Sequence, residues 1–268
     1  MCEFCAKHGE GKKWYLNAHN YAVELLDDLK RRDFIAHFYE RYIERGSRSI
    51  SRIEKIFQSR PESVGKMASA YEEEMRENHF GQVVPVEDVY QIINMSNSIV
   101  RFQCGCMWEA GRKEGRYCFG ISFGAPAWYD MVDRDYFGSP KIAEMEHLTK
   151  EEAVSCIKML DVDGMVHSVW TFGTPFIGAI CNCDMEYCLG MRSTFGLGMN
   201  TMFRAEQLMG IDESKCTGCG ACQSKCQMKA IKDSGVHGKY LVDKEGCIGC
   251  GVCRTVCNFD AMSYQPNI

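Results

Sequence analysis

The sequence predicts an α+β fold in three parts. A mostly helical N-terminal region comes first, then a small, cysteine-rich α+β central domain, then a compact unit with a repeated cysteine spacing. Three patterns support this: apolar residues at helical spacing in 14–57, a helical pattern followed by alternation in 151–172, and two equal cysteine spacings near the C-terminus. We therefore expect domains at 1–84, 85–205 and 206–268.

The N-terminal region predicts three helical runs between residues 14 and 57, followed by a charged helix over 66–78. The second run is expected to end near Gly46, because glycine is common just past helix ends. We interpret the apolar stripes as ordinary core rather than as a docking surface. They contain Leu16, Tyr21, Val23, Leu25, Leu26, Leu29, Ile35, Phe38, Tyr42, Ile43, Ile50, Ile53, Ile56 and Phe57.

The central region alternates between helical and extended patterns. We expect a helix from Val86 to about Met95, a glycine-rich loop over 111–124, and a helix over 151–160. Asp163-Gly164 then predicts a turn, and the alternation over 165–172 predicts a strand. A helix, turn and strand in this order resemble a winged-helix element, although the acidic charge of the region argues against DNA binding.

Composition excludes several classes of protein. The chain has 268 residues, 46% of them hydrophobic, and a net charge of −5. No apolar run reaches the roughly 18 residues of a membrane span, and the segment from Met1 to Lys7 lacks the apolar core of a secretory signal. The excess acid lies in 81–205, and no basic stripe of the kind that binds nucleic acid is present. We expect a cytoplasmic protein without a nucleic-acid partner.

Cysteine is the unusual component, with 17 residues. An odd number and no export signal argue against a disulfide framework. Most of the cysteines are separated by only one or two residues, a spacing typical of metal or cluster ligands. The sequence therefore predicts a metalloprotein.

The strongest motif is C-terminal and occurs twice. The spacing Cys-x2-Cys-x2-Cys-x3-Cys begins at Cys216 and again 31 residues later at Cys247. Three closely spaced thiolates can surround one cubane, while the fourth reaches a second cluster and is expected to start a helix. Glycines between the cysteines allow backbone N–H groups to approach the cluster sulfides; they are Gly218, Gly220, Gly249 and Gly251.

Residues 206–266 resemble bacterial ferredoxins that carry two [4Fe-4S] clusters. The resemblance implies one cluster on Cys216, Cys219, Cys222 and Cys257, and another on Cys247, Cys250, Cys253 and Cys226. Gln227 and Asn258 stand where these ferredoxins usually have a proline. Because so short a segment has little apolar core, the clusters should serve as its core, and the apo form should unfold.

Nine cysteines remain outside this repeat. Cys156 lies alone in a predicted helix and is expected to pack as a small buried hydrophobe. The other eight form Cys2-x2-Cys5, Cys104-x-Cys106 with Cys118, and Cys181-x-Cys183 with Cys188. They are candidate ligands for one or two additional [4Fe-4S] clusters, with zinc as an alternative.

Three central motifs are similar to a poorly characterised family of 4Fe-4S-binding proteins from anaerobes. They are Pro85-Val86-Glu87-Asp88, Cys104-Gly105-Cys106, and Cys118-Phe119-Gly120 with Phe123-Gly124. In that family an element like Gly164-Met165-Val166-His167 precedes Cys181-Asn182-Cys183, and Cys216-Thr217-Gly218-Cys219 follows. The resemblance spans residues 85–266 and implies iron–sulfur binding without naming a substrate.

The grouping of these eight cysteines has two solutions. The six central ones give one cluster with two spare thiols, or two clusters if Cys2 and Cys5 complete the ligand sets. His8 is a weaker candidate ligand, and His167 is expected to be a core histidine with satisfied hydrogen bonds. Large aromatic residues are candidates for a pocket wall near the cysteines: Trp108, Trp128, Trp170 and Phe172, with the segment Thr171–Pro175.

Two functions follow from these motifs. The first is an iron–sulfur electron-transfer protein with a redox protein partner, working at low potential in an anaerobe; such clusters span roughly −700 to +450 mV. The second is an iron–sulfur oxidoreductase, in which the ferredoxin tail feeds electrons to a central cysteine-ligated site that reduces a small molecule or a partner. An iron–sulfur regulator using the winged-helix-like element is a third. No glycine-rich nucleotide motif supports nucleotide or flavin binding.

Overall fold

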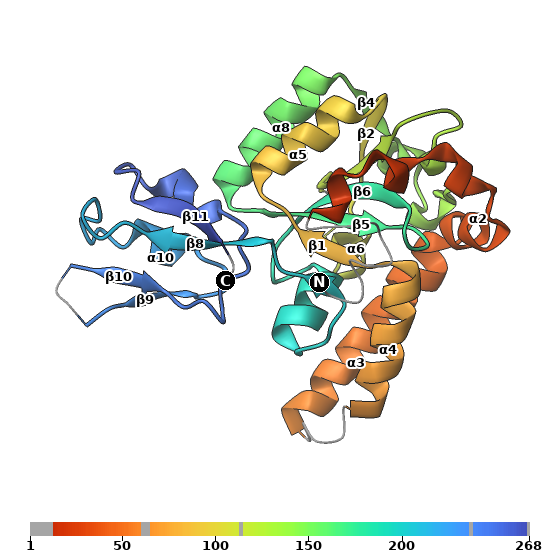
Figure 1. Cartoon of the computed structure of the whole chain (residues 1–268). Coiled ribbons are helices and arrows are strands. Elements are labelled where there is room, and N and C mark those ends of the chain that lie inside the picture. Colours follow the sequence, from red (N-terminus) through yellow and green to blue (C-terminus); the bar gives the residue numbers. More distant parts are fainter. Residues whose placement is uncertain (1–12, 60–64, 113–114, 236–237, 267–268) are drawn as a thin grey trace.

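The computed structural model describes residues 13–59, 65–112, 115–235 and 238–266. A seven-stranded sheet lies at the centre, with helices on both of its faces, and a smaller unit with two two-stranded sheets extends from one side (Figure 1). The chain is therefore α+β, as the sequence predicts.

The central sheet is mixed and has the strand order β4-β2-β3-β6-β5-β1-β7. All neighbours are antiparallel except β1 and β7. Since successive side chains of a strand point to opposite faces, each strand contributes to two cores. The strands are β1 (Gly81–Val83), β2 (Ser98–Phe102), β3 (Cys118–Ser122), β4 (Glu146–Leu148), β5 (Val166–Thr171), β6 (Ile177–Cys183) and β7 (Met202–Phe203).

Two helices, α5 (Val86–Met95) and α8 (Lys150–Asp163), cover one face of the sheet. A capping box of Thr149 and Glu152 starts α8, and Gly164, with a φ of 95°, ends it. Ile92 and Ile157 are fully buried against the sheet. Both helices, the turn and the strand after it are confirmed.

The N-terminal region covers parts of both faces of the sheet: Trp14, Tyr15 and Tyr21 pack in the core beneath α5 and α8, whereas the residues from Leu26 onward pack on the opposite face. Short turns η1 (Trp14–Leu16), η2 (Ala18–Tyr21) and η3 (Val23–Asp27) lead into α2 (Leu29–Ala36), η4 (Phe38–Glu44), α3 (Arg45–Ser59) and α4 (Gly65–Asn78). The predicted helix end near Gly46 is wrong, because α3 continues through this residue. Gly46 is buried, and a Cβ there would lie 3.6 Å from both Leu189 and Tyr71.

Two expectations for the central region need correction. The predicted loop over 111–124 contains the buried strand β3, in which Gly120 fits closely between Tyr129 and Val100. The glycine there reflects dense packing on a strand rather than a turn. The winged-helix-like interpretation holds only for the local order of α8, turn and β5, because β5 lies inside the seven-stranded sheet. Short elements η6 (Trp128–Met131), η7 (Asp135–Phe137) and α7 (Pro140–Ala143) connect β3 to β4.

The C-terminal unit contains two antiparallel pairs, β8 (Gln207–Ile211) with β11 (Met262–Pro266) and β9 (Ile231–Asp233) with β10 (Tyr240–Val242). Two short helices, α10 (Ala221–Lys225) and η9 (Val252–Val256), lie between them. Cys226 and Cys257 follow these helices directly. The expectation that the fourth cysteine of each motif starts a helix is therefore wrong: it ends one.

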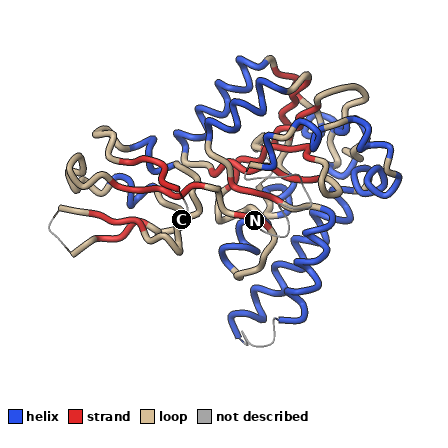
Figure 2. The backbone as a smooth tube through the Cα atoms, in the orientation of Figure 1, coloured by secondary structure: helices blue, strands red, loops and turns tan. Residues whose placement is uncertain are grey.

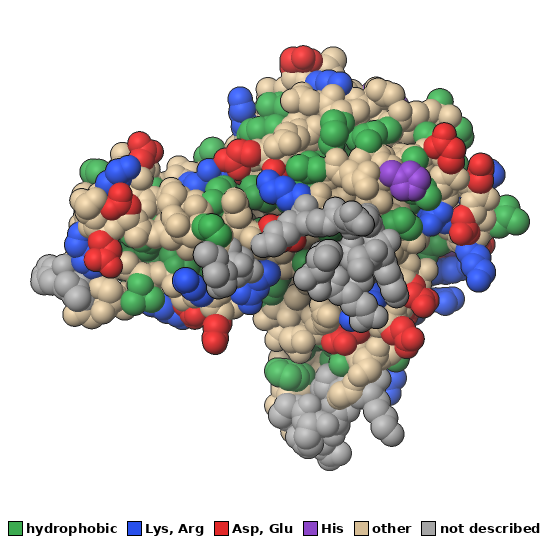
Figure 3. All heavy atoms as spheres, in the orientation of Figure 1, with side chains coloured by type: hydrophobic (Ala, Val, Ile, Leu, Met, Phe, Trp, Pro, Cys, Tyr) green, Lys and Arg blue, Asp and Glu red, His purple; other side chains and the backbone are tan. Residues whose placement is uncertain are grey.

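The C-terminal unit packs closely on the rest of the chain (Figure 2). Ile248 belongs to the same apolar core as Phe38 and Trp170, and its carbonyl accepts a hydrogen bond from the Ala205 N–H. Acidic and basic side chains are interspersed over the face drawn in Figure 3. Within the described ranges, every helix is too short or too polar to cross a membrane.

Candidate metal centres

Two cavities in the C-terminal unit are each lined by four cysteines of the repeat. The outer cavity is lined by Cys216, Cys219, Cys222 and Cys257. The inner cavity, which faces the central sheet, is lined by Cys226, Cys247, Cys250 and Cys253. Each cavity therefore takes three cysteines from one motif and the fourth from the other, the same grouping that the ferredoxin resemblance implies.

Glycines make the cysteine loops of this unit possible. Gly218 and Gly249 occupy equivalent places in the two motifs and have φ values of 73° and 72°. A Cβ on Gly218 would lie 2.2 Å from the Gly238 carbonyl oxygen, and one on Gly249 would lie 2.0 Å from that of Gln207. Backbone contact and left-handed conformation together exclude a side chain at both positions.

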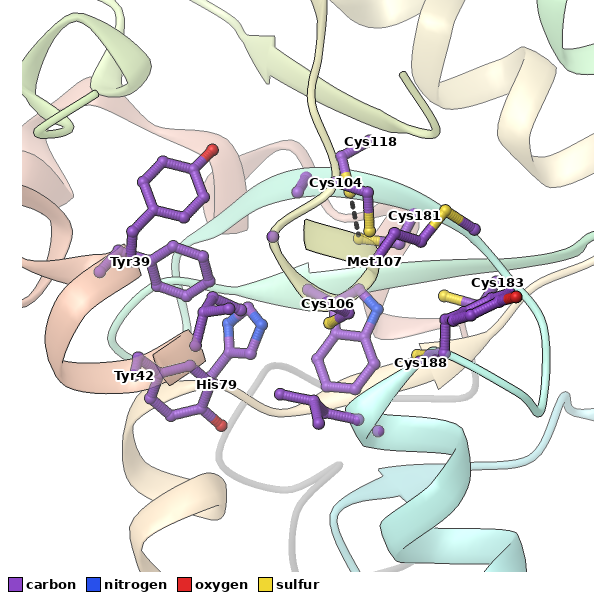
Figure 4. Close-up of a pocket in the computed structure, with 18 of the residues that line it drawn as sticks. Tyr39, Tyr42, His79, Cys104, Cys106, Met107, Cys118, Cys181, Cys183 and Cys188 are labelled. Atoms are coloured by element: carbon purple, nitrogen blue, oxygen red, sulfur yellow. Dashed lines mark hydrogen bonds between the residues drawn. The ribbon is translucent and has the colours of Figure 1, made fainter. Parts of the chain in front are cut away.

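The six central cysteines meet around one cavity, although they come from four separate segments of the chain (Figure 4). Alternation along β6 points Cys181 and Cys183 to the same face of the sheet, and Cys118 lies opposite Cys181 on β3. Cys104 and Cys106 lie at the start of α6 (Gly105–Glu109). Cys188 caps the N-terminus of α9 (Leu189–Met191), which runs into η8 (Arg192–Gly196).

These thiols form a closed circuit, which we call the six-thiol ring. Each of the six thiols interacts with two others, in the order 104, 118, 181, 183, 188, 106 and back to 104. The sulfurs of Cys118 and Cys181 are 3.9 Å apart. The fifteen cysteines in the described ranges are all free thiols. The ring is therefore a set of potential thiolate ligands and not a group of disulfides.

Hydrogen bonds within the ring distribute its protons unequally. Cys183 accepts from Cys181 and Cys188, which lowers its pKa to about 5. Hydrogen bonds from Cys104 and Cys188 likewise hold the pKa of Cys106 well below its usual value. Cys104 and Cys188 have raised pKa values, since they donate these hydrogen bonds and are buried. Cys106 and Cys183 therefore favour the thiolate form.

The rest of the cavity wall is largely aromatic. Phe38, Tyr39, Tyr42, Trp170 and Phe172 line it, together with the imidazole of His79. The Nδ1–H of His79 donates to the Thr171 carbonyl at 2.6 Å, and the ring stacks on Trp170 at a centroid distance of 4.8 Å. Burial lowers the pKa of His79 to about 4, so its imidazole is neutral.

Hydrogen bonds lie on both faces of β6, and those on one face reach the thiol of Cys183. The Trp170 indole N–H donates to the Ser168 hydroxyl at 2.9 Å, and that hydroxyl lies 3.8 Å from the sulfur of Cys183. On the other face of the sheet, the His167 Nδ1–H donates to the side chain of Asn182 at 2.6 Å. Partners of this kind orient metal ligands and tune the metal that they hold.

His167 is the buried core histidine that the sequence predicts, but its hydrogen bonds are only partly satisfied. Its Nε2 is 3.6 Å from the Asp161 carboxylate and has no hydrogen-bond partner. Cys156 packs beside the core in α8 and accepts a hydrogen bond from Arg101 at 3.3 Å.

The candidates for the pocket wall divide into two groups. Trp170 and Phe172 line the cavity of the six-thiol ring. Trp128 is buried elsewhere, with its indole N–H donating to the carbonyls of Ile121 and Gly178, and Trp108 packs against Phe137. Of the segment Thr171–Pro175, the lining residue is Phe172. The candidate ligands Cys2, Cys5 and His8 lie outside the described residues.

The contribution of His79, Tyr39 and Tyr42 to the cavity is not predicted by the sequence. His79 follows a charged helix and stands in no motif, so no local signal indicates its role. Tyr42 belongs to an apolar stripe that the sequence assigns to the core, whereas Tyr39 lies outside the predicted stripes; both are buried.

The inner cavity of the C-terminal unit adjoins the six-thiol ring. Val166 lines that cavity and is also the strand partner of Cys183 in the sheet. Gln227 connects the two parts: its Oε1 accepts from the Met185 N–H at 2.9 Å, and its Nε2 donates to the Gly164 carbonyl at 2.6 Å. The residue that replaces the usual proline therefore joins the C-terminal unit to the central sheet.

The thiols of these sites surround open spaces. A zinc ion holds its sulfur ligands at about 2.3 Å, which brings them to roughly 4 Å from one another. In the described ranges, no three Cys, His, Asp or Glu side chains converge in that way, including those of the C-terminal unit. In the six-thiol ring and in both smaller cavities, the thiols instead surround a space.

Comparison with known proteins identifies the C-terminal unit. Residues 204–261 match the family model of the 4Fe-4S dicluster domain. No curated protein and no solved structure matches the chain. The C-terminal unit is thus a ferredoxin-type dicluster domain, which supports an iron–sulfur electron-transfer role.

Proposed function

We propose that the chain is an iron–sulfur electron-transfer protein in which the dicluster domain exchanges electrons between a redox protein partner and a further iron–sulfur centre in the six-thiol ring. Two [4Fe-4S] clusters on the eight repeat cysteines would act as one-electron carriers. The observation that supports this most strongly is the shared position of Val166, which lines the inner cavity and pairs with Cys183 of the ring.

The exposure of the cysteines distinguishes the two ends of the dicluster domain. Cys219 of the outer cavity is exposed, whereas Cys247 and Cys253 of the inner cavity are buried. Phe259, which also lines the outer cavity, is 48% exposed. The outer end of the dicluster domain is therefore where a partner can approach, and the inner end faces the ring.

Close spacing supports transfer between the inner cavity and the ring. Directly opposed residues of an antiparallel pair have Cα atoms about 4.5–5.5 Å apart, so Val166 separates the two sites by about one side chain. The hydrogen bonds of Gln227 hold this contact in place.

The charge pattern supports low-potential chemistry of the kind used by anaerobes. The excess acid of the chain lies in the central region, and among the described residues that line the ring cavity there is no Lys or Arg to stabilise added electrons. Negative surroundings favour the oxidised clusters and lower their potential. Reversible potentials near or above zero would contradict this part of the proposal.

Anaerobic purification followed by iron and sulfide analysis and EPR of the reduced protein tests the proposal. We expect clearly more than about eight irons per chain. We also expect EPR signals broadened by magnetic interaction between the inner cluster and the central centre. About eight irons, or a central signal without such interaction, would contradict it.

One observation favours an iron–sulfur oxidoreductase as a second candidate. His79, Tyr39 and Tyr42 line one side of the ring cavity, and the cysteines line the other. A small molecule can therefore lie on the first side, next to the thiols. Carbon monoxide and cyanide are suitable probes of an open iron position. A change in the EPR spectrum of the central centre on adding either one supports the enzyme, and an unchanged spectrum supports the electron carrier.

A further inference from the structure

The six-thiol ring has more ligands than one cubane requires. A [4Fe-4S] cluster takes four thiolates, as each set of four in the dicluster domain illustrates. In the ring, every thiol interacts with two others, so no two thiols are separated from the remaining four. All six line one cavity. The arrangement therefore gives no reason to divide them into four cluster ligands and two cysteines that bind no iron.

The ring is instead composed of two similar halves. Cys104-x-Cys106 with Cys118 forms one triad, and Cys181-x-Cys183 with Cys188 forms the other. In the first triad the close pair lies at a helix start and the third cysteine on a strand. In the second the close pair lies on a strand and the third cysteine at a helix start. Each triad thus draws on one strand of the sheet and one helix N-terminus.

The size of the cavity agrees with a large cofactor. It measures about 60 Å³, against about 20 Å³ for each of the two cavities in the dicluster domain. Gly105 and Gly190 keep its wall close to the thiols, because a Cβ would meet Ile43 at 3.1 Å in the first case and Trp170 at 2.2 Å in the second. The chain therefore leaves more space here than at a site for four thiolates.

We propose that the six-thiol ring binds one iron–sulfur cofactor larger than a single cubane, with three thiolates from each triad bound to one half of it. Three thiolates leave one iron of a four-iron half without a protein thiolate. The two triads face the same cavity, so one inorganic sulfide would be able to complete both remaining positions. This inference rests on the proposed function, which requires an iron–sulfur centre in the ring but not its size.

The iron content of the full-length protein, purified anaerobically, provides the first test. We expect about sixteen irons per chain, eight from the dicluster domain and eight from the ring. About twelve irons would overturn the inference and leave the proposed function intact, because the ring would then hold one cubane. About eight irons would overturn both.

Single Cys→Ser variants provide the second test. Each of the six ring variants, from Cys104→Ser to Cys188→Ser, should lose iron while keeping the EPR signals of the dicluster domain. Those retained signals show that the variant has folded. Cys156→Ser is the matched control, since this cysteine lies in α8 outside the ring, and its iron content should be unchanged. Two ring positions that tolerate serine without loss of iron would overturn the inference.

The double variant Cys2→Ser/Cys5→Ser distinguishes the remaining alternative. If these two cysteines completed two separate four-thiolate sites, the protein would also contain about sixteen irons. A cofactor that depends on the ring alone predicts unchanged iron in this variant. Loss of about four to eight irons would overturn the inference in favour of two ordinary clusters.

Discussion

Gln227 offers the sharpest test of how the dicluster domain is attached. Gln227→Ala removes the hydrogen bonds from the Met185 N–H and to the Gly164 carbonyl. Each is worth about 0.5–1.5 kcal/mol, so the free energy of unfolding should fall by about 1–3 kcal/mol. For a chain of this size, that corresponds to a melting temperature lower by about 2–10 °C.

The assay is thermal unfolding of the cluster-loaded protein, followed anaerobically by circular dichroism at one fixed scan rate. Asn258→Ala is the matched control, because Asn258 holds the equivalent position in the second motif and is exposed. Its effect should stay within about 0.5 kcal/mol. Gln227→Glu keeps the acceptor for Met185 but places a carboxylate oxygen against the Gly164 carbonyl, so at neutral pH it should destabilise the protein at least as much as Gln227→Ala.

Hydrogen exchange gives a local measurement of the same contact. The Met185 amide should exchange faster in Gln227→Ala than in the native protein, since its acceptor is gone. Equal melting temperatures for Gln227→Ala and Asn258→Ala, with unchanged exchange at Met185, would refute the attachment that we describe.

Two further predictions concern the metal centres. Gly190→Ala places a Cβ 2.2 Å from the Trp170 ring, so it should destabilise the protein by about 1–3 kcal/mol and reduce the iron bound in the six-thiol ring. Gly196→Ala is the control: the space around Gly196 is open, so neither the stability nor the iron content should change. Removing the clusters with a chelator and an oxidant should unfold the dicluster domain, because its small core includes Cys247 and Cys253. Hydrogen exchange measures this: the amides of β8 and β11 should lose their protection, whereas those of β5 and β6 should keep it. A dicluster domain that stays protected without its clusters would contradict the prediction.

The elements that could be predicted are those whose signal is local. A capping box, an apolar stripe and a glycine in the left-handed region define α8 and the turn at Gly164 within one short segment. The family match of residues 204–261 likewise rests on cysteine spacing that is visible in the sequence. In such cases, neighbouring residues alone determine the structure.

Predictions failed where packing from distant segments decided the structure. Gly46 looks like a helix end, yet it is buried within α3, where Leu189 and Tyr71 pack against it. Gly120 looks like part of a loop, yet it lies on β3 because Tyr129 and Val100 leave no room for a side chain. In both cases the residues that surround the glycine come from other segments of the chain, and at Gly120 they also leave no room for a side chain.

The six-thiol ring likewise depends on contacts between distant segments, which local sequence does not reveal. The sequence identifies all six cysteines as candidate ligands but not that they meet in one place. Their meeting depends on the order β3-β6-β5 in the sheet and on the helix starts at Cys104 and Cys188. Neither sheet order nor the approach of a remote helix is encoded in local spacing.

The dicluster domain is nearly symmetric in sequence but lies in asymmetric surroundings, and this asymmetry distinguishes an end open to a partner from an end that faces the ring. The two residues that follow its fourth cysteines are Gln227, bonded to the central sheet, and Asn258, exposed to solvent. The cavity beside Gln227 adjoins the buried ring, whereas the cavity beside Asn258 includes the exposed Cys219. A repeat used only as a soluble carrier would have no need to differ at these two positions. A relay between a docking partner and an internal site requires one exposed end and one attached end, and the two halves of this repeat provide them.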